Sequence, residues 1–417
     1  MIYLDHNATS PLDPRVLEAM LPYLRDKWGN ASSRDHAYGW DARDAVEEAR
    51  FQVAGLINAK HNEIVFTSGA TESIGIVLGG LLGTHRARDR GEKARETKRD
   101  QDSILVSCVE HEAVRSAGIR LCERGVRVDE IPMDAQGRID TALLESLLST
   151  RKPTLLSIMA ANNETGVRFP LKACAALAHS HGALFFTDAT QALGKVPLDA
   201  EADGFDLAAF SAHKLHGPKG IGALYVRGGP GAIPLEPALA GGGQEGGLRP
   251  GTLNVPAIVG FGEACRLAGL EMAEETLRLR RLRDLLEAAL IAGVPGLRVN
   301  GGETERLANT SNLVFPGIDA RALIRDMHDV AVSTRSACSS GSAEPSHVLK
   351  AMGLSDEDAF ASVRFSLGRF TTEAEIDTAA EKAAASYRKL AGLSGGFDGD
   401  ADAASGSFRG EARFPEI

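Results

Sequence analysis

Lys214 is the residue of this chain best placed for covalent chemistry. It lies in a polar loop between two short apolar runs, Leu207 to Phe210 and Gly222 to Val226. Runs of this length bounded by Gly and Pro indicate buried strands joined by a functional connection. An amine just past a buried strand can be partly desolvated, and it then acts as a nucleophile or forms a Schiff base. By itself, however, a loop lysine is more often an ordinary solvated side chain.

A candidate anion site lies upstream, in the segment from Glu63 to Ser73, EIVFTSGATES. It predicts a strand at Ile64 to Phe66, a turn at Ser68-Gly69 and a helix that begins near Thr71. The free backbone N–H groups and the dipole of a helix N-terminus both favour an anion. The segment alone is compatible with a phosphate site or with a simple capped helix start.

Polar side chains follow the other predicted strands at the points where those strands end. Asp188 comes directly after the apolar run Leu184 to Thr187. Burying its carboxylate is costly unless a cationic group pairs with it. Open α/β sheets bind their ligands at this edge. The residues so placed are His111, Asn163, Asp188, Gln191, Ser211 and His213.

Taken jointly, these features fit one cofactor. Pyridoxal phosphate needs a lysine for a Schiff base, an acidic partner for its pyridinium nitrogen and a cradle for its phosphate. Lys214, Asp188 and the turn Gly69-Ala70-Thr71 would supply these three groups. Because each lies at the exit of a predicted strand, we expect them to meet at one edge of the sheet.

The elements that must position these residues indicate an α/β fold. Strand-like and helical runs alternate between Ile64 and Val226, which is typical of a mainly parallel sheet covered on both faces. A long helical region, about Ala257 to Ala292, leads to further short strands. We therefore expect a large cofactor-binding domain over residues 14–260 and a smaller α+β domain formed by residues 1–13 and 261–392.

Two stretches do not fit this pattern. Residues 84–102 are nearly all charged or polar and predict a solvated surface insertion. Residues 393–417 are rich in Gly, Ala, Asp and Ser without periodicity, which predicts a disordered tail.

Composition narrows the class of partner and the location. The chain has 417 residues and 43% hydrophobic content, enough for a full globular core. Its formal net charge of −10 disfavours nonspecific binding to nucleic acid or to an anionic membrane, so a small-molecule substrate is expected. Without a long apolar run or a signal-peptide pattern, we predict a cytoplasmic protein.

Cys338 stands apart from the other cysteines. It lies among small and polar residues in TRSACSSGSAEPSHVL, whereas Cys108 lies in an apolar run. None of the five cysteines forms a CxxC pair, so reduced thiols are expected. A thiol in such a loop can be exposed and reactive. Its neighbours alone leave a catalytic role and a structural one equally open.

Motifs spread from Tyr3 to about Leu390 carry a family resemblance. They are YLDHNAT, FTSGATES, EHEAV, ANNETGV, TDATQALGK, SAHKLHGPKGIGALYV, GGGQEGGLRPGTLN, the segment around Cys338 and RFSLGRFTT. With these motifs the chain closely resembles the NifS/IscS-type cysteine desulfurases, class V aminotransferases with the fold-type I architecture of pyridoxal-phosphate enzymes. The resemblance implies a homodimer whose active sites lie near the subunit interface.

The resemblance also implies a role for individual residues. Lys214 would carry the cofactor and Asp188 would pair with its pyridinium nitrogen. His111 would stack on the ring and is a candidate proton donor or acceptor, while Gln191 would contact the phenolic oxygen. The phosphate would be held by Ala70, Thr71, Ser211 and His213, with Thr252 reaching it from the other subunit.

The implied reaction converts L-cysteine to L-alanine. Arg364 would hold the substrate carboxylate together with Asn163, which is also expected to contact the cofactor. Cys338 would take the sulfur as a persulfide, for delivery to iron–sulfur cluster assembly or to another acceptor protein. Two alternatives stay open: a selenocysteine lyase or other class V enzyme, and a noncatalytic, scaffold-like role in a sulfur-transfer complex.

Overall fold

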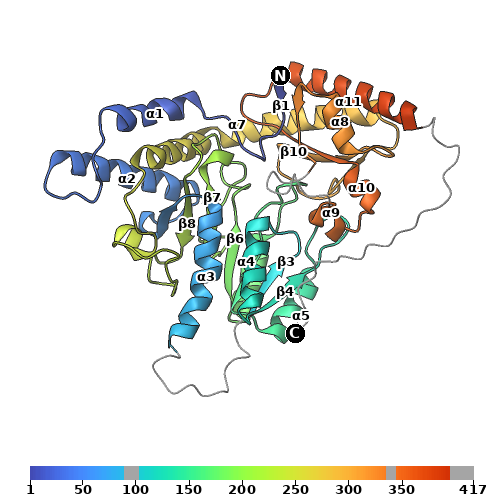
Figure 1. Ribbon diagram of the computed structural model, residues 1–417. Coiled ribbons are helices and arrows are strands. Elements are labelled where there is room, and N and C mark those ends of the chain that lie inside the picture. The colour runs from blue at the N-terminus through green and yellow to red at the C-terminus, as the bar shows by residue number, and fades with distance from the viewer. Residues whose placement is uncertain (89–102, 335–343, 395–417) are drawn as a thin grey trace.

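A seven-stranded sheet forms the centre of the larger part of the structure (Figure 1). The computed structural model describes residues 1–88, 103–334 and 344–394. In spatial order the strands are β2 (Ile64–Thr67), β8 (Gly222–Val226), β7 (Leu207–Ser211), β6 (Leu184–Asp188), β5 (Leu155–Ser157), β3 (Ser103–Ser107) and β4 (Arg127–Ile131). Only β8 runs antiparallel to its neighbours, so the prediction of a mainly parallel sheet is confirmed.

Both faces of this sheet are buried, as its continuous apolar strands require. Successive side chains of a strand point to opposite faces. In β7, Ala208 and Phe210 accordingly belong to one core cluster, and Leu207 and Ala209 belong to another. The first cluster is covered by α1 (Pro14–Arg25), α2 (Ala37–Leu56), α5 (Thr141–Arg151) and α6 (Leu171–Ser180), and the second by α3 (Ala70–Arg88) and α4 (Glu112–Glu123).

The long helix α7 (Val255–Gly293) contributes to two separate cores (Figure 1). Its first half, from Val255 to Ala268, packs into the cluster beside the large sheet. Its second half, from Leu279 to Leu290, packs into a third cluster. That cluster is built with α8 (Ala320–Asp326), α11 (Glu373–Ser394) and the antiparallel strands β9 (Arg298–Val299), β10 (Thr310–Val314) and β12 (Ser362–Ser366).

Two short helices complete this part of the chain, α9 (His347–Ala351) and α10 (Asp356–Phe360). Although α9 lies late in the sequence, its residues Val348 and Leu349 belong to the cluster beside the large sheet.

The N-terminal residues connect the two parts of the molecule. Strand β1 (Ile2–Tyr3) pairs in parallel with β11 (Val330–Ala331). The chain then crosses to the large sheet, where the backbone N–H of Ser10 donates to the carbonyl of His213 at 2.9 Å. Because this crossing runs beside the loop that holds Lys214, it places residues 5–10 next to that lysine.

Three predictions concern residues that lie outside the described ranges. They are most of the 84–102 insertion, nearly all of the 393–417 tail, and Cys338. Within the described ranges, no helix combines the length and the apolar character needed to cross a lipid bilayer.

Candidate active site

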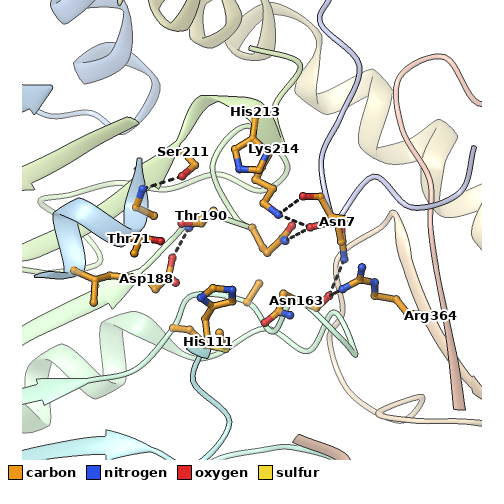
Figure 2. A pocket seen from close by; sticks show the side chains of 16 residues that line it. Asn7, Thr71, His111, Asn163, Asp188, Thr190, Ser211, His213, Lys214 and Arg364 are labelled. Carbon is orange, nitrogen blue, oxygen red and sulfur yellow. Dashed lines mark hydrogen bonds between the residues drawn. The ribbon is translucent and has the colours of Figure 1, made fainter. Parts of the chain in front are cut away.

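A pocket lies where β6 and β7 end and where α3 and α4 begin (Figure 2). Side chains from well-separated stretches of sequence line it. They are Asn7, Ala8, Ala70, Thr71, Ile74, His111, Met159, Ala161, Asn163, Asp188, Thr190, Gln191, Ser211, His213, Lys214 and Arg364. Of the residues predicted for the site, all but Thr252 and Cys338 therefore line one pocket.

Lys214 lies at the end of a single 3-10 turn, η2 (Ala212–Lys214), that follows β7 directly. Its Nζ donates to the backbone carbonyls of Asn7, at 2.5 Å, and Ala8, at 2.8 Å (Figure 2). The turn is tight: a Cβ at Gly217 would lie 2.8 Å from the carbonyl oxygen of Ala212. Position 217 therefore requires glycine. The two hydrogen bonds hold the Lys214 amine at the wall of the pocket.

The N-terminus of α3 forms one end of the pocket. The backbone N–H of Ala70 donates to Ser211 Oγ at 2.8 Å, which joins the start of α3 to the end of β7. The approach depends on Gly222, where a Cβ would lie 2.6 Å from Gly69 Cα. Since Thr71 and Ser211 add hydroxyl groups to a helix N-terminus, this end of the pocket suits a phosphate.

His213 lies beside Lys214 and is neutral at pH 7. Its pKa is lowered to about 4, mainly by burial and also by the nearby charges of Lys214, Lys219 and Lys195. Its Nδ1 lies 3.0 Å from Thr9 Oγ1. A neutral imidazole can hydrogen-bond an anion without adding a full positive charge.

Asp188 ends β6 as a buried carboxylate, 5% exposed. Its Oδ1 accepts from the backbone N–H of Thr190 at 3.0 Å. Among residues 1–88, 103–334 and 344–394, no cationic side chain lies within ion-pair distance of it. A buried carboxylate without a cationic partner is costly, and a protonated pyridine nitrogen would remove that cost. The donor set therefore fits pyridoxal phosphate: the N-terminus of α3 would suit its phosphate, and Asp188 would suit its ring nitrogen.

His111 is the N-cap of α4 and points into the pocket across from Lys214 (Figure 2). Its Nδ1 accepts from the backbone N–H of Ala113 at 3.2 Å. That bond assigns the proton of the neutral ring to Nε2. The ring is thus held in one tautomer with an N–H on its other side.

Arg364 reaches the pocket from β12, more than 100 residues downstream of Lys214. It is 1% exposed, and it donates to Asp5 Oδ1 at 2.7 Å and to the carbonyl of Asn163 at 2.9 Å. Its Nε has no partner among the described residues. A buried guanidinium with an unused donor is suited to a carboxylate ligand.

Asn7 is among the residues of the pocket that the sequence did not predict. Its backbone carbonyl accepts from Lys214, and its Nδ2 donates to the carbonyl of Asn163 at 3.2 Å. The N-terminal turn carries no chemical signal, because the atom used here is a carbonyl that every residue has. Its place in the motif YLDHNAT was the one available hint.

Thr252 does not line the pocket of its own chain. It lies exposed in the loop after η3 (Gln244–Gly247). Glu245, within η3, is held by a buried bidentate ion pair with Arg50 at 2.7 Å, and it also accepts from the backbone N–H of Phe66. The loop that carries Thr252 is therefore anchored at one end to the core.

Cys338 lies outside the described residues, but the chain on either side of it is anchored close to the pocket. Ser333 pairs with Arg364 in a β-bridge and donates from its Oγ to Asp5 at 2.8 Å. After the gap, Ser346 Oγ donates to Glu164 at 2.5 Å.

Comparisons with known proteins agree with this site. The Aminotransferase class-V family matches residues 2–378. A cysteine desulfurase IscS from Anaeromyxobacter sp. (strain Fw109-5) is 46% identical over 395 residues, which are 94% of each chain. A solved structure titled NIFS-LIKE PROTEIN is 35% identical and covers 93% of this chain and all of its own, with a TM-score of 0.83. SspA in complex with cysteine is 31% identical with a TM-score of 0.75, and the match covers 89% of this chain and 100% of SspA.

These matches confirm the predicted fold-type I architecture and the dependence on pyridoxal phosphate. The chain thus belongs to the class-V aminotransferase family, and within it to the cysteine desulfurases of the NifS/IscS type.

Proposed function

We propose that this desulfurase acts on L-cysteine in the pocket that Lys214 and Arg364 share, and passes the sulfur to Cys338. The observation that carries the proposal is the pairing of two features in one pocket. At one end are the helix N-terminus and the buried Asp188, which suit the cofactor, and at the other is a buried arginine with an unused donor.

Several side chains would hold the cofactor. Asp188 would pair with the ring nitrogen, Gln191 would contact the phenolic oxygen and His111 would stack on the ring. The phosphate would lie against Ala70, Thr71, Ser211 and His213, with Thr252 supplied by a second subunit. When bound, pyridoxal phosphate supplies an electron sink that stabilises negative charge at the substrate α-carbon.

Arg364 and Asn163 would fix the substrate carboxylate. The guanidinium is already held in place by Asp5 and by the carbonyl of Asn163, so it loses little freedom on binding. The α-carbon of the substrate would then face Lys214. Once the Lys214 amine is free, it would remove the α-proton. His111, with its proton on Nε2, would serve the later proton transfers.

Cys338 can reach this pocket on chain length alone. It is five residues beyond Ser333, which pairs with Arg364, and five residues span at most roughly 17 Å. Its thiolate would attack the substrate sulfur, so that an S–S bond forms as the C–S bond breaks. The electron pair of that bond stays on the three-carbon fragment, which takes up protons and leaves as alanine.

The wider setting is also part of the proposal. We propose a cytoplasmic homodimer that delivers its persulfide sulfur to iron–sulfur cluster assembly or to another acceptor protein. We further propose a large domain over 14–260 and a small one from 1–13 and 261–392. The change of core along α7 supports that division.

Substitution of Cys338 tests this proposal. Cys338→Ala should keep the yellow absorbance of the lysine-bound cofactor but lose sulfide release from L-cysteine by roughly 100-fold or more, since the sulfur acceptor is gone. Alanine and sulfide formation are measured together, and the wild-type persulfide is located by mass spectrometry. Cys122→Ala is the matched control, because Cys122 is a partly buried thiol of α4 that does not line the pocket, so its loss should leave sulfide release unchanged. Unimpaired sulfide release by Cys338→Ala would remove Cys338 from the mechanism.

A further inference from the structure

A second lysine, Lys195, lies behind the pocket wall and contacts two residues that line it. Its Nζ donates to Gln191 Oε1 at 2.8 Å and to Asn7 Oδ1 at 3.4 Å. Lys195 itself does not line the pocket. It is therefore placed to act on the site only through these neighbours.

The contact with Lys195 determines which way the Gln191 amide points. An ammonium group has three donors and no acceptor, so the amide atom facing it must be the oxygen. The amide nitrogen then faces the carbonyl of Asn7, to which it donates at 2.9 Å. The contacts at the oxygen and at the nitrogen of the Gln191 amide therefore require the same orientation. The second N–H of the Gln191 amide stays available to a group in the pocket.

Asn7 links the same lysine to the catalytic amine. Its carbonyl accepts from both Gln191 and Lys214, and its side-chain oxygen accepts from Lys195 and from Asn309 Nδ2 at 3.2 Å. Lys195 thus holds the side chain of the residue whose backbone holds Lys214. Loss of its ammonium would loosen both Gln191 and Asn7.

The backbone of Lys195 is fixed independently of these contacts. Its N–H donates to the carbonyl of Ala192 at 3.0 Å, and its carbonyl accepts from Thr276 Oγ1 of α7 at 3.2 Å. Gly194, directly before it, has a φ of +70°, and a Cβ there would lie 3.0 Å from Ala268 Cβ. The turn is therefore rigid, as a positioning group requires.

The charge of Lys195 faces several other groups. Its pKa is lowered to about 7, mainly by burial and also by the charges of Lys214 and Arg364, while the charge of Glu275 partly offsets them. The histidines whose pKa it lowers in turn are His6, His213 and His216. Since repulsion between two cations is mutual, a charged Lys195 also disfavours a proton on Lys214.

We propose that Lys195 is a positioning residue for the desulfurase reaction: it orients the Gln191 amide toward the cofactor and, through Asn7, holds Lys214 in its working position. The inference rests on the proposed role of Gln191 as the contact of the phenolic oxygen. On this inference, Lys195 belongs to the active site through its contacts with Gln191 and Asn7. Only Gln191 and Asn7 line the pocket.

The test uses the holoenzyme with Lys195→Met, which keeps the length of the side chain and removes its charge and donors. We expect the pH midpoint of the visible cofactor band to rise by about one unit, because a nearby cation is lost. We expect cofactor dissociation to become about tenfold faster, because Gln191 is no longer held. Lys195→Arg should restore most of both properties. Lys172→Met, on the exposed face of α6, should match the wild type.

A purely structural Lys195 would lower thermal stability in Lys195→Met but leave the pH midpoint of the band unchanged, and that result would overturn the inference. If Lys195→Met does not accumulate, Lys195→Gln gives the same comparison with a smaller change in polarity. A wild-type protein without the cofactor band would instead contradict the proposed function. If the wild type shows the cofactor band and Lys195→Met has the same pH midpoint and the same rate of cofactor dissociation, only the role of Lys195 is contradicted.

Discussion

At the scale of single residues, Glu110 shows how burial changes the chemistry of a side chain next to the site. Its Oε1 accepts from Ser107 Oγ at 2.6 Å and from the backbone N–H of Met159 at 2.7 Å, while its Oε2 has no partner among the described residues. Its pKa is raised to about 8, mainly by burial and also by the charge of Asp188, against the opposing effect of the hydrogen bonds from Ser107 and Met159. Glu110 is therefore a neutral carboxyl at pH 7, so it adds no second negative charge near Asp188.

The raised pKa of Glu110 predicts a pH-dependent difference in stability. The folded protein binds the Glu110 proton more tightly than the unfolded chain does. The stabilisation of the folded protein by this proton is therefore complete below about pH 4.5 and is lost as pH rises through about 8. Glu110→Gln keeps the neutral shape and cannot titrate. Relative to wild type, its free energy of unfolding should rise between pH 5 and pH 8 by on the order of 4 kcal/mol at most.

Urea unfolding of the holoenzyme at pH 5, 6.5 and 8 measures this difference. The control is Glu112→Gln on the same helix start, whose side chain is 42% exposed and should show no such trend. A difference between Glu110→Gln and wild type that stays constant with pH would show that Glu110 is ionised in the folded protein.

At the scale of elements, the phosphate end of the pocket depends on how closely α3 approaches the pair β7 and β8. At the start of β8, Gly222 lies against the backbone of two other elements. A Cβ there would come within 2.2 Å of the carbonyl oxygen of Phe210 and 2.6 Å of Gly69 Cα. Since both are backbone atoms, neither can move away by changing a rotamer.

Gly222→Ala should therefore destabilise the protein by about 2 kcal/mol or more and weaken cofactor binding, because β8 or the turn before α3 must shift. Gly55→Ala makes the same chemical change on the exposed side of α2, where nothing lies within 4 Å. It should stabilise the protein by about 0.5–1 kcal/mol, since alanine is the better helix former. Denaturant unfolding and cofactor titration of both variants check the pair. Equal stabilities would show that the close contact at Gly222 is relieved at no cost.

At the scale of the whole molecule, the pocket is completed by parts of the chain that fold onto different cores. Arg364 comes from the sheet of the third cluster, and Asn7 comes from the crossing N-terminal segment. Thr252, by contrast, is exposed on a loop whose other end is anchored by the Arg50–Glu245 pair. We propose that a second subunit brings this loop to the phosphate.

Mixed dimers test the shared site. Lys214→Ala should abolish covalent cofactor attachment, and Thr252→Ala should weaken cofactor binding in every site of its own homodimer. A heterodimer of the two variants combines one intact lysine with one intact threonine, so tight cofactor binding should reappear after mixing and refolding. Light scattering should give a particle of twice 44.1 kDa. Mixing without any recovery would mean that Thr252 acts within its own chain or not at all.

The sequence by itself determined the parts of this protein that depend on local pattern. Buried strands show as apolar runs, and the parallel sheet follows from their alternation with helices, so the residue order alone places Asp188, Ser211 and Lys214 at strand ends. Family motifs then supplied roles for Arg364 and His111. Residue types and local order were sufficient for this much.

Only the tertiary structure decided the contacts that hold these groups in working positions. Lys214 is held by the backbone carbonyls of Asn7 and Ala8, some 200 residues away, and Lys195 orients Gln191 against the same Asn7. No sequence pattern marks such contacts. Every residue has a carbonyl, and the direction of an amide is set by whichever partners the fold brings to its two ends.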